Sequence, residues 1–147
     1  MTVHLIKLCV GCDSPEDLRQ WQEERLAERR KRGEPPVLRH VTRSMPKRRD
    51  EVLDGGSLYW VIKGYVRVRQ RIVGLEPVVG EDGEPRCAIL YDPELVFVTP
   101  RQHRPFQGWR YLEPERAPPD LRDIGWQSDE EQPPPGMLAE LRELGLI

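Results

Sequence analysis

SLYWVIKGYVRVRQRIV, residues 57–73, is the stretch that decides the fold. It holds two runs rich in β-branched and aromatic side chains, 57–62 and 65–73, and such runs are typical of strands. The dipeptide Lys63-Gly64 interrupts them, and glycine allows the chain to reverse there. We therefore expect a β-hairpin at the centre of the fold.

Helix and strand signals extend outward from this hairpin in both directions. Ser14 can cap a helix that has Pro15 at its first position and that Gly33 would end. The sequence therefore predicts one long helix over residues 14–32. Further strands are predicted over residues 3–8, 37–45, 86–91 and 95–98. Because short turns join most of them, the predicted fold class is α+β, with a mainly antiparallel, strongly bent sheet or a partly closed barrel.

The last third of the chain is rich in proline and in acidic residues. Prolines recur from Pro100 onward and predict an irregular chain, within which residues 113–135 form an acidic, proline-rich segment. Apolar residues then recur at helical spacing and predict a short helix over residues 136–147. All these elements fit one domain, residues 1–147, because a chain of this length can bury a single core without disulfides.

Charge is strongly segregated along the chain. The formal net charge is -2, but residues 25–49 carry ten Lys/Arg against two acids, a net +8, and residues 112–147 carry three Arg against nine acids, a net -6. The four cations at 29–32 fit the solvated end of a helix, where they stabilise the helix dipole, better than a docking site. The fold can nevertheless present a basic face.

The sequence also indicates where the protein resides. The N-terminus lacks the pattern of a secretory signal, and no apolar run approaches the length of a membrane span. We therefore expect a soluble, cytoplasmic protein without a membrane partner. Three cysteines, an odd number without an export signal, favour reduced thiols.

Cys9 and Cys12 are separated by two residues, a spacing shared by zinc sites and redox relays. A zinc site needs two more ligands, for which Cys87 and a histidine are available, and a redox relay needs its cysteines at a helix N-terminus. The sequence meets neither need, so we favour structural or incidental thiols over both alternatives. We predict that the protein binds neither a structural metal nor a cofactor.

The second half of the hairpin alternates strictly between two kinds of side chain. The alternation predicts that Tyr65, Arg67, Arg69 and Arg71 share one face of the strand, opposite Val66, Val68 and Ile72. Three aligned arginines repel one another unless anions lie opposite. The anions could be acids on adjacent strands, for which Glu76, Glu84 and Glu94 are candidates, or the phosphates of a bound ligand.

A second cluster, residues 101–111, combines cations with aromatic rings on a loop, a composition suited to ligand binding. Together the two clusters predict non-enzymatic binding of a nucleic acid, RNA being favoured, or of a phosphorylated nucleotide-like ligand. The predicted binding residues are Arg43, Lys63, Tyr65, Arg67, Arg69, Arg71, Arg101, Arg104 and Trp109.

Two other functions stay open. The chain has no phosphate-loop, nucleophile-elbow or paired-histidine motif, although Ser57 could in principle act as a nucleophile with His40 or His103 as its base. A protein-interaction or assembly factor is the main alternative. It would dock through the acidic, proline-rich segment and the C-terminal helix.

Four segments carry a resemblance to a known family: residues 4–11, 55–64, 92–95 and 104–112. They resemble a group of small uncharacterised proteins, mainly from alphaproteobacteria, known only as a domain of unknown function. GGSLYWVIKG, residues 55–64, is the most specific part of a resemblance that spans nearly the whole chain. It implies a bacterial cytoplasmic protein and carries no activity. In architecture the predicted elements are also similar to the PUA-like barrels, a group that includes RNA-binding modules.

Overall fold

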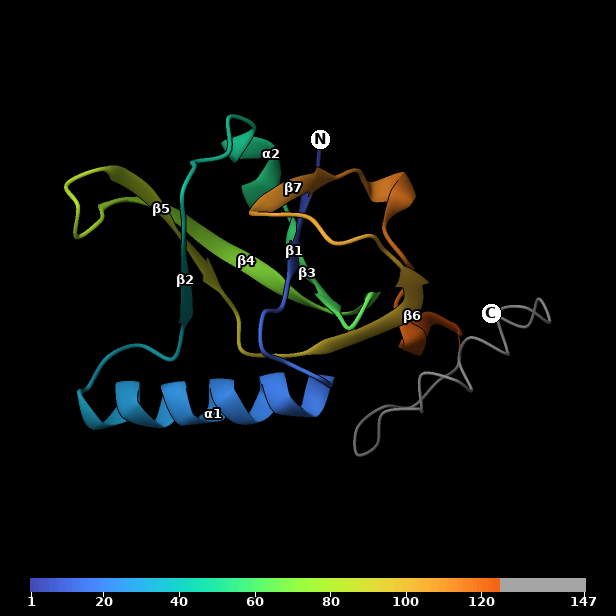
Figure 1. The fold of residues 1–147 in the computed structure, drawn as a ribbon, viewed down its shortest axis with the longest axis horizontal. Helices are drawn as coiled ribbons and strands as arrows, with labels where there is room; N and C mark the ends of the chain where they lie inside the picture. The colour runs from blue at the N-terminus through green and yellow to red at the C-terminus, as the bar shows by residue number, and fades with distance from the viewer. Residues whose placement is uncertain (125–147) are drawn as a thin grey trace.

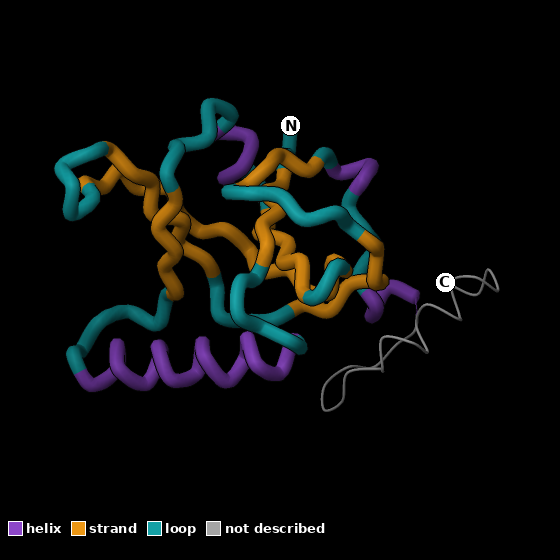
Figure 2. Tube along the Cα trace, in the orientation of Figure 1, coloured by secondary structure: helices purple, strands orange, loops and turns teal. Residues whose placement is uncertain are grey.

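The computed structural model describes residues 1–124, which form a mixed seven-stranded sheet with a long helix packed against it (Figures 1 and 2). The strands and helices are, in chain order, β1 (His4–Leu8), α1 (Pro15–Lys31), β2 (Leu38–Thr42), α2 (Arg49–Leu53), β3 (Ser57–Ile62), β4 (Tyr65–Val79), β5 (Pro85–Tyr91), β6 (Val96–Gln102) and β7 (Trp109–Leu112).

The hairpin of β3 and β4 lies at the centre of the sheet. Every residue of β3 is buried, and β4 pairs with it antiparallel from Ile62 and Tyr65 onward. The turn between them has positive φ at both Lys63 (48°) and Gly64 (81°), the conformation of a two-residue type I′ turn. The hairpin predicted from the sequence is thus present, and its second strand continues to Val79.

β4 joins the two halves of the seven-stranded sheet. Its first half pairs with β3 and β6, and its second half pairs with β5, with a shift of register between Ile72 and Gly74. β5 in turn pairs with β2. The strand order is therefore β2-β5-β4-β3-β1-β7, with β6 also on β4.

The sheet is open and contains one parallel pair. β1 pairs parallel with β3, because the chain between them runs through α1, β2 and α2 before it returns, whereas the other pairings are antiparallel. The two strands that end the order, β2 and β7, are not paired with each other in the described chain. The partly closed, PUA-like barrel expected as one possibility is therefore wrong.

Gly56 shows why the GGSLYWVIKG segment begins as it does. A Cβ atom at Gly56 would lie 2.3 Å from the carbonyl oxygen of Val52 and 2.4 Å from that of Val3. Contacts this short cannot be relieved by moving a side chain, because both neighbours are backbone. Glycine is therefore the residue that lets the start of β3 approach α2 and the chain before β1.

α1 begins with Ser14 as its N-cap, whose side chain accepts a hydrogen bond from the Asp17 amide at 3.2 Å, and Pro15 follows at the first position. Leu18 and Gln22 are buried on its inner side. Leu18 packs into the main core with the apolar side chains of β1, β3, β4 and β5. A smaller core on the opposite face of β3 contains Ile6, Tyr59, Val61, Val66, Val98 and Phe106.

The chain after β5 is more regular than predicted. β6 continues through Pro100 to Gln102, and Trp109–Leu112 forms β7 on the edge of β1, so irregularity from Pro100 onward is wrong. Two short 3-10 helices follow, Pro114–Arg116 and Leu121–Ile124. The rest of the acidic segment and the predicted helix over 136–147 lie outside the described residues. Among the described helices, none has the length and apolar character to cross a membrane.

Candidate functional site

The predicted binding residues lie in three separate places. Arg67, Arg69 and Arg71 are on β4, while Arg43 and Trp109 line a groove on the side of the sheet that α1 covers. Lys63, Tyr65 and Arg101 lie around the β3–β4 turn, where Tyr65 is opposite Gln102 and Val66 is opposite Arg101. The exposed Arg104 follows β6.

A β-bulge at Arg67 breaks the predicted alternation. Trp60 is opposite Val68 and Val61 is opposite Val66, so Arg67 has no partner position on β3. An extra residue of this kind turns the side chains after it to the other face of the strand. Val66 accordingly packs in the smaller core and Val68 in the main core, although the sequence predicted that they share a face.

Arg67 and Arg69 are not exposed, so the three arginines do not form one open stripe. Arg67 is only 5% exposed, and burial lowers the pKa of its guanidinium. Arg69 forms a bidentate ion pair with Asp120, at 2.8 Å from Nε and 2.7 Å from an Nη atom, and donates to the Ser57 hydroxyl at 3.0 Å. The carboxylate that pairs with Arg69 is thus Asp120 and none of the three glutamates considered from the sequence.

The residues around the β3–β4 turn are mostly exposed and loosely held. Lys63 lies 3.6 Å from Asp13, in a pair whose side chains are 65% and 76% exposed. Arg101 donates to the backbone carbonyl of Arg116. These contacts leave a small basic surface around the turn.

A long basic groove runs along the other side of the molecule. Its first hollow, of about 740 Å³, is lined by Arg43 and Trp109 together with Lys7, Lys47 and Tyr111. A second hollow, of about 610 Å³, shares Lys7 and Val41 with the first. A third, of about 250 Å³, shares Trp21, Arg25, Arg39 and Val41 with the second. We call the three adjoining hollows the basic groove.

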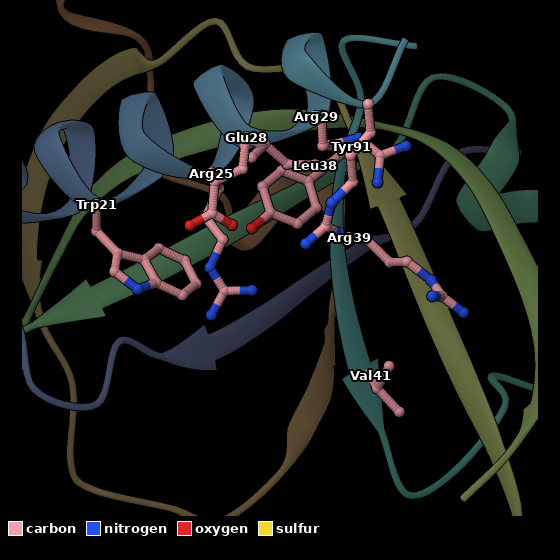
Figure 3. A pocket seen from close by; sticks show the side chains of 9 residues that line it. Trp21, Arg25, Glu28, Arg29, Leu38, Arg39, Val41 and Tyr91 are labelled. Atoms are coloured by element: carbon pink, nitrogen blue, oxygen red, sulfur yellow. The ribbon is translucent and has the colours of Figure 1, made fainter. Parts of the chain in front are cut away.

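The elements that form the groove place cations and rings on its walls. Figure 3 shows Trp21 and Arg25 side by side on α1, and Arg39 and Val41 projecting from the same side of β2. The pairing of β3, β1 and β7 aligns Trp60, Lys7 and Trp109 in one row across the sheet. Residues that are far apart in the sequence therefore lie near one another along the groove.

The groove is strongly positive. Seven cations line it, namely Lys7, Arg25, Arg29, Arg32, Arg39, Arg43 and Lys47, against the acids Asp17 and Glu28. Arg29 is paired with Glu34 at 3.2 Å, but the other six have no carboxylate within 4.0 Å among the described side chains of residues 1–122. Two arginines elsewhere are neutralised by carboxylates, since Arg69 pairs with Asp120 and Arg48 with Glu51 and Glu113.

His40 lies against the Trp60 ring in the second hollow, with ring centroids 5.9 Å apart in an edge-on contact. Burial, followed by the charges of Lys7 and Arg25, lowers the pKa of His40 to about 4. The imidazole is therefore neutral at pH 7. Its depressed pKa comes mainly from burial, and the charges of Lys7 and Arg25 add to it.

The aromatic rings at the two ends of the groove are held by neighbours. Trp109 donates from Nε1 to the carbonyl oxygen of Ser44 at 3.0 Å, and Tyr111 contacts it edge-on at 5.0 Å between centroids. At the other end, the guanidinium of Arg25 lies 4.4 Å from the centre of the Trp21 ring. Such flat, polarisable surfaces suit stacking with nucleobases.

Cys9 and Cys12 are half-buried and line the second hollow. Burial raises the pKa of the Cys9 thiol, the opposite of the shift that a redox relay uses. Among the described side chains, no three of His, Cys, Asp or Glu lie close enough together to hold a metal ion. Cys87 is buried elsewhere, with its sulfur 3.5 Å from that of Met45.

Ser57 is unsuited to the nucleophilic role considered from the sequence. It is 1% exposed, and its hydroxyl accepts a hydrogen bond from Arg69. The imidazole beside Ser57 is that of His4. Its Nδ1 accepts a hydrogen bond from the Ser57 backbone amide at 3.0 Å and not from the Ser57 hydroxyl.

Most of the groove was not anticipated from the sequence. Of its lining, only Arg43 and Trp109 were predicted binding residues, whereas Lys7, Trp21, Arg25, Arg39 and Lys47 were missed. The signal that could have found three of them, Arg25, Arg39 and Lys47, is the net charge of +8 over residues 25–49.

The comparisons with known proteins identify a family but no activity. The family described as "Protein of unknown function (DUF1489)" matches residues 5–147, which confirms the resemblance seen in the sequence. No curated protein and no solved structure matches this chain.

Proposed function

Because the chain belongs to the DUF1489 family, whose function is unknown, we propose from the groove itself that the protein binds nucleic acid without catalysing a reaction, with RNA favoured. The proposal keeps the predicted ligand class and moves its site from β4 to the basic groove. Arg43 and Trp109 are the predicted residues that it retains.

One observation carries the proposal: six groove cations lack a carboxylate partner among the described residues, and they share their surface with aromatic side chains. Unpaired cations on neighbouring elements repel one another in the free protein. A polyanion removes that repulsion when its phosphates bind, and it releases counterions into the solvent. What distinguishes the groove is that these cations lie together with aromatic rings in adjoining hollows, whereas Arg69 pairs with Asp120.

RNA is favoured over duplex DNA because of the shape of the surface. A duplex major groove accepts a protruding helix or β-ribbon, but here α1 packs on the sheet and contributes one wall of a hollow. Rings set inside a groove can reach bases only where those bases are unpaired and unstacked. Single-stranded segments of RNA meet that requirement.

The test is a binding titration of fluorescently labelled single-stranded RNA, measured by anisotropy at roughly 50–200 mM salt. We expect the affinity to fall steeply with salt, and Arg39→Ala, Arg43→Ala and Arg25→Ala each to weaken binding and reduce the salt slope by about one. Arg30→Ala is the matched control for Arg25→Ala, since Arg30 is exposed on the same helix and does not line the groove.

Two results would contradict the proposal. One is absence of RNA binding at the lowest salt concentration by a protein that is folded by circular dichroism. The other is equal weakening by Arg30→Ala and Arg25→Ala, which would assign binding to the net charge of α1 instead of to the groove.

A further inference from the structure

We propose that the groove holds one continuous single strand of RNA across all three hollows, with bases stacked at two stations, Trp109 at one end and Trp21 with Arg25 at the other. The inference rests on the proposed function and specifies its ligand. It concerns the length and strandedness of the RNA and the two rings that read its bases.

The Trp109 station is a preorganised stacking surface. The indole is fixed through its Nε1 by the Ser44 carbonyl and along its edge by Tyr111. Tyr111 is itself held, because its hydroxyl accepts from the Arg48 amide at 3.0 Å and the Arg48 guanidinium lies 5.3 Å from its ring centre. A ring already locked in place loses little conformational entropy when a base stacks on it.

The hollow beside Trp109 is large enough for a nucleotide. Its volume of about 740 Å³ falls in the range of small-ligand pockets, roughly 300–1,000 Å³. Lys7, Arg43 and Lys47 line the same hollow. The phosphate of a nucleotide whose base stacks on Trp109 would therefore have cations within the same hollow.

The Trp21 station lies on the exposed side of α1. Trp21 keeps 39% of its surface exposed, an unusual amount for so large an apolar side chain, and it lines both the second and the third hollow. Arg25 stacks on it at 4.4 Å, which presents a flat guanidinium as well as an indole. Bases stack on both kinds of plane.

The hollows between the stations adjoin one another, and cations line all three. Lys7 and Val41 belong to the hollow at Trp109 and to the second hollow, while Arg39 belongs to the second and the third. A mononucleotide can occupy one hollow only, so it would use one station and a fraction of the cations. A strand of roughly four nucleotides or more, the lower end of known single-strand site sizes, would use them all.

A duplex would leave both stations empty, because its bases are already stacked on one another. It could still approach the groove edge with its phosphates. Single-strand preference therefore separates this inference from a purely electrostatic basic patch.

The experiment measures the affinity of the full-length protein for oligoadenylates of one, two, four and eight nucleotides and for an eight-base-pair RNA duplex. We expect affinity to rise steeply up to about four nucleotides and to be at least tenfold weaker for the duplex at equal salt. Trp109→Leu and Trp21→Leu should each weaken octamer binding by about 5- to 100-fold. Trp109→Phe keeps a stacking ring but loses the hydrogen bond to Ser44, so it should weaken binding less than Trp109→Leu does, and it guards against loss through misfolding.

The outcomes distinguish failure of the two-station strand from failure of the proposed nucleic-acid binding. Octamer binding that matches mononucleotide or duplex binding, or that is unchanged in both leucine variants, overturns the two-station strand and leaves a nucleic-acid groove in place. Failure of every RNA to bind overturns both.

Discussion

His40 couples the protonation of one residue to the stability of the fold. Its pKa of about 4 lies below the value of about 6.5 that histidine has in an unfolded chain, mainly because it is buried beside Trp60. As the pH falls below about 6.5, the unfolded chain takes up this proton first. The folded state is therefore progressively destabilised between pH 6.5 and 4, and the residue has no such effect above pH 7.

We expect the free energy of unfolding to fall by about 1–2 kcal/mol between pH 7.5 and 5 because of His40, after allowance for its partial exposure. His40→Gln should remove that part of the pH dependence. Urea unfolding of both proteins at the two pH values measures it. Identical pH dependence in the variant and the parent would show that His40 does not contribute.

Asp120 neutralises the half-buried Arg69 and ties the first half of β6 to the segment after β7. Its side chain is 11% exposed, that of Arg69 is 20% exposed, and its backbone forms an isolated bridge with Val98. Asp120→Asn should destabilise the protein by about 2–4 kcal/mol, because the guanidinium then stays buried without its counter-charge.

Thermal and urea unfolding at pH 7 test this expectation. Asp82→Asn is the matched control, because Asp82 pairs with Arg86 at 2.8 Å while 54% of its side chain remains exposed, and we expect it to change stability little. A loss of stability no larger for Asp120→Asn than for Asp82→Asn would refute the structural role of the buried pair.

At the scale of elements, a buried polar network fastens α1 to the sheet. Gln22 of α1 and Gln70 of β4 exchange hydrogen bonds of 2.9 and 2.7 Å, and Trp60 of β3 donates from Nε1 to Gln70 at 2.9 Å. Gln22 and Gln70 are at most 2% exposed. Each polar group in the network therefore depends on its partners, because water does not reach it.

Gln70→Leu should lower the free energy of unfolding by about 2–4 kcal/mol, since it leaves the Gln22 amide and the Trp60 N–H without partners. The double variant Gln22→Leu with Gln70→Leu should lose less than the sum of the single losses, because the Gln22 group is then absent. Gln20→Leu, on the exposed side of α1, is the control. Additive losses in urea unfolding would show that the two residues are not coupled.

At the scale of the whole molecule, we expect the distribution of charge to decide whether the protein binds a polyanion, more than the formal net charge of -2 does. We expect the protein to bind a heparin column at low salt, because the groove concentrates positive potential on one side. Arg39→Glu with Arg43→Glu should lower the salt concentration needed for elution. Arg30→Glu with Lys31→Glu changes the net charge equally but outside the groove, so its effect should be clearly smaller. Equal shifts for the two variants would mean that heparin responds to overall charge.

The positions of these arginines explain why the groove proposed as the binding site was predicted only in part. Arg69 and Asp120 are 51 residues apart, so no local pattern indicates that they pair. The bulge at Arg67 adds one residue to the strand, and the alternating sequence contains no signal for it. By contrast, Arg43 and Trp109, which line the groove, were predicted from local composition, since Arg43 lies in the basic stretch 25–49 and Trp109 in the cluster of cations and rings at 101–111.

Local signals in the sequence by themselves determined the β3–β4 hairpin with its Lys63-Gly64 turn, the cap at Ser14 and the single block of positive charge over residues 25–49. These features depend on φ preferences, side-chain-to-backbone hydrogen bonds and composition, which act over a few residues. Only the tertiary structure decided that β1 pairs parallel with β3, that the sheet stays open and that Lys7, Arg39, Arg43, Trp21 and Trp109 line one groove. The reason is physical: these outcomes depend on which distant surfaces bury each other best, and that is a property of the packed chain as a whole.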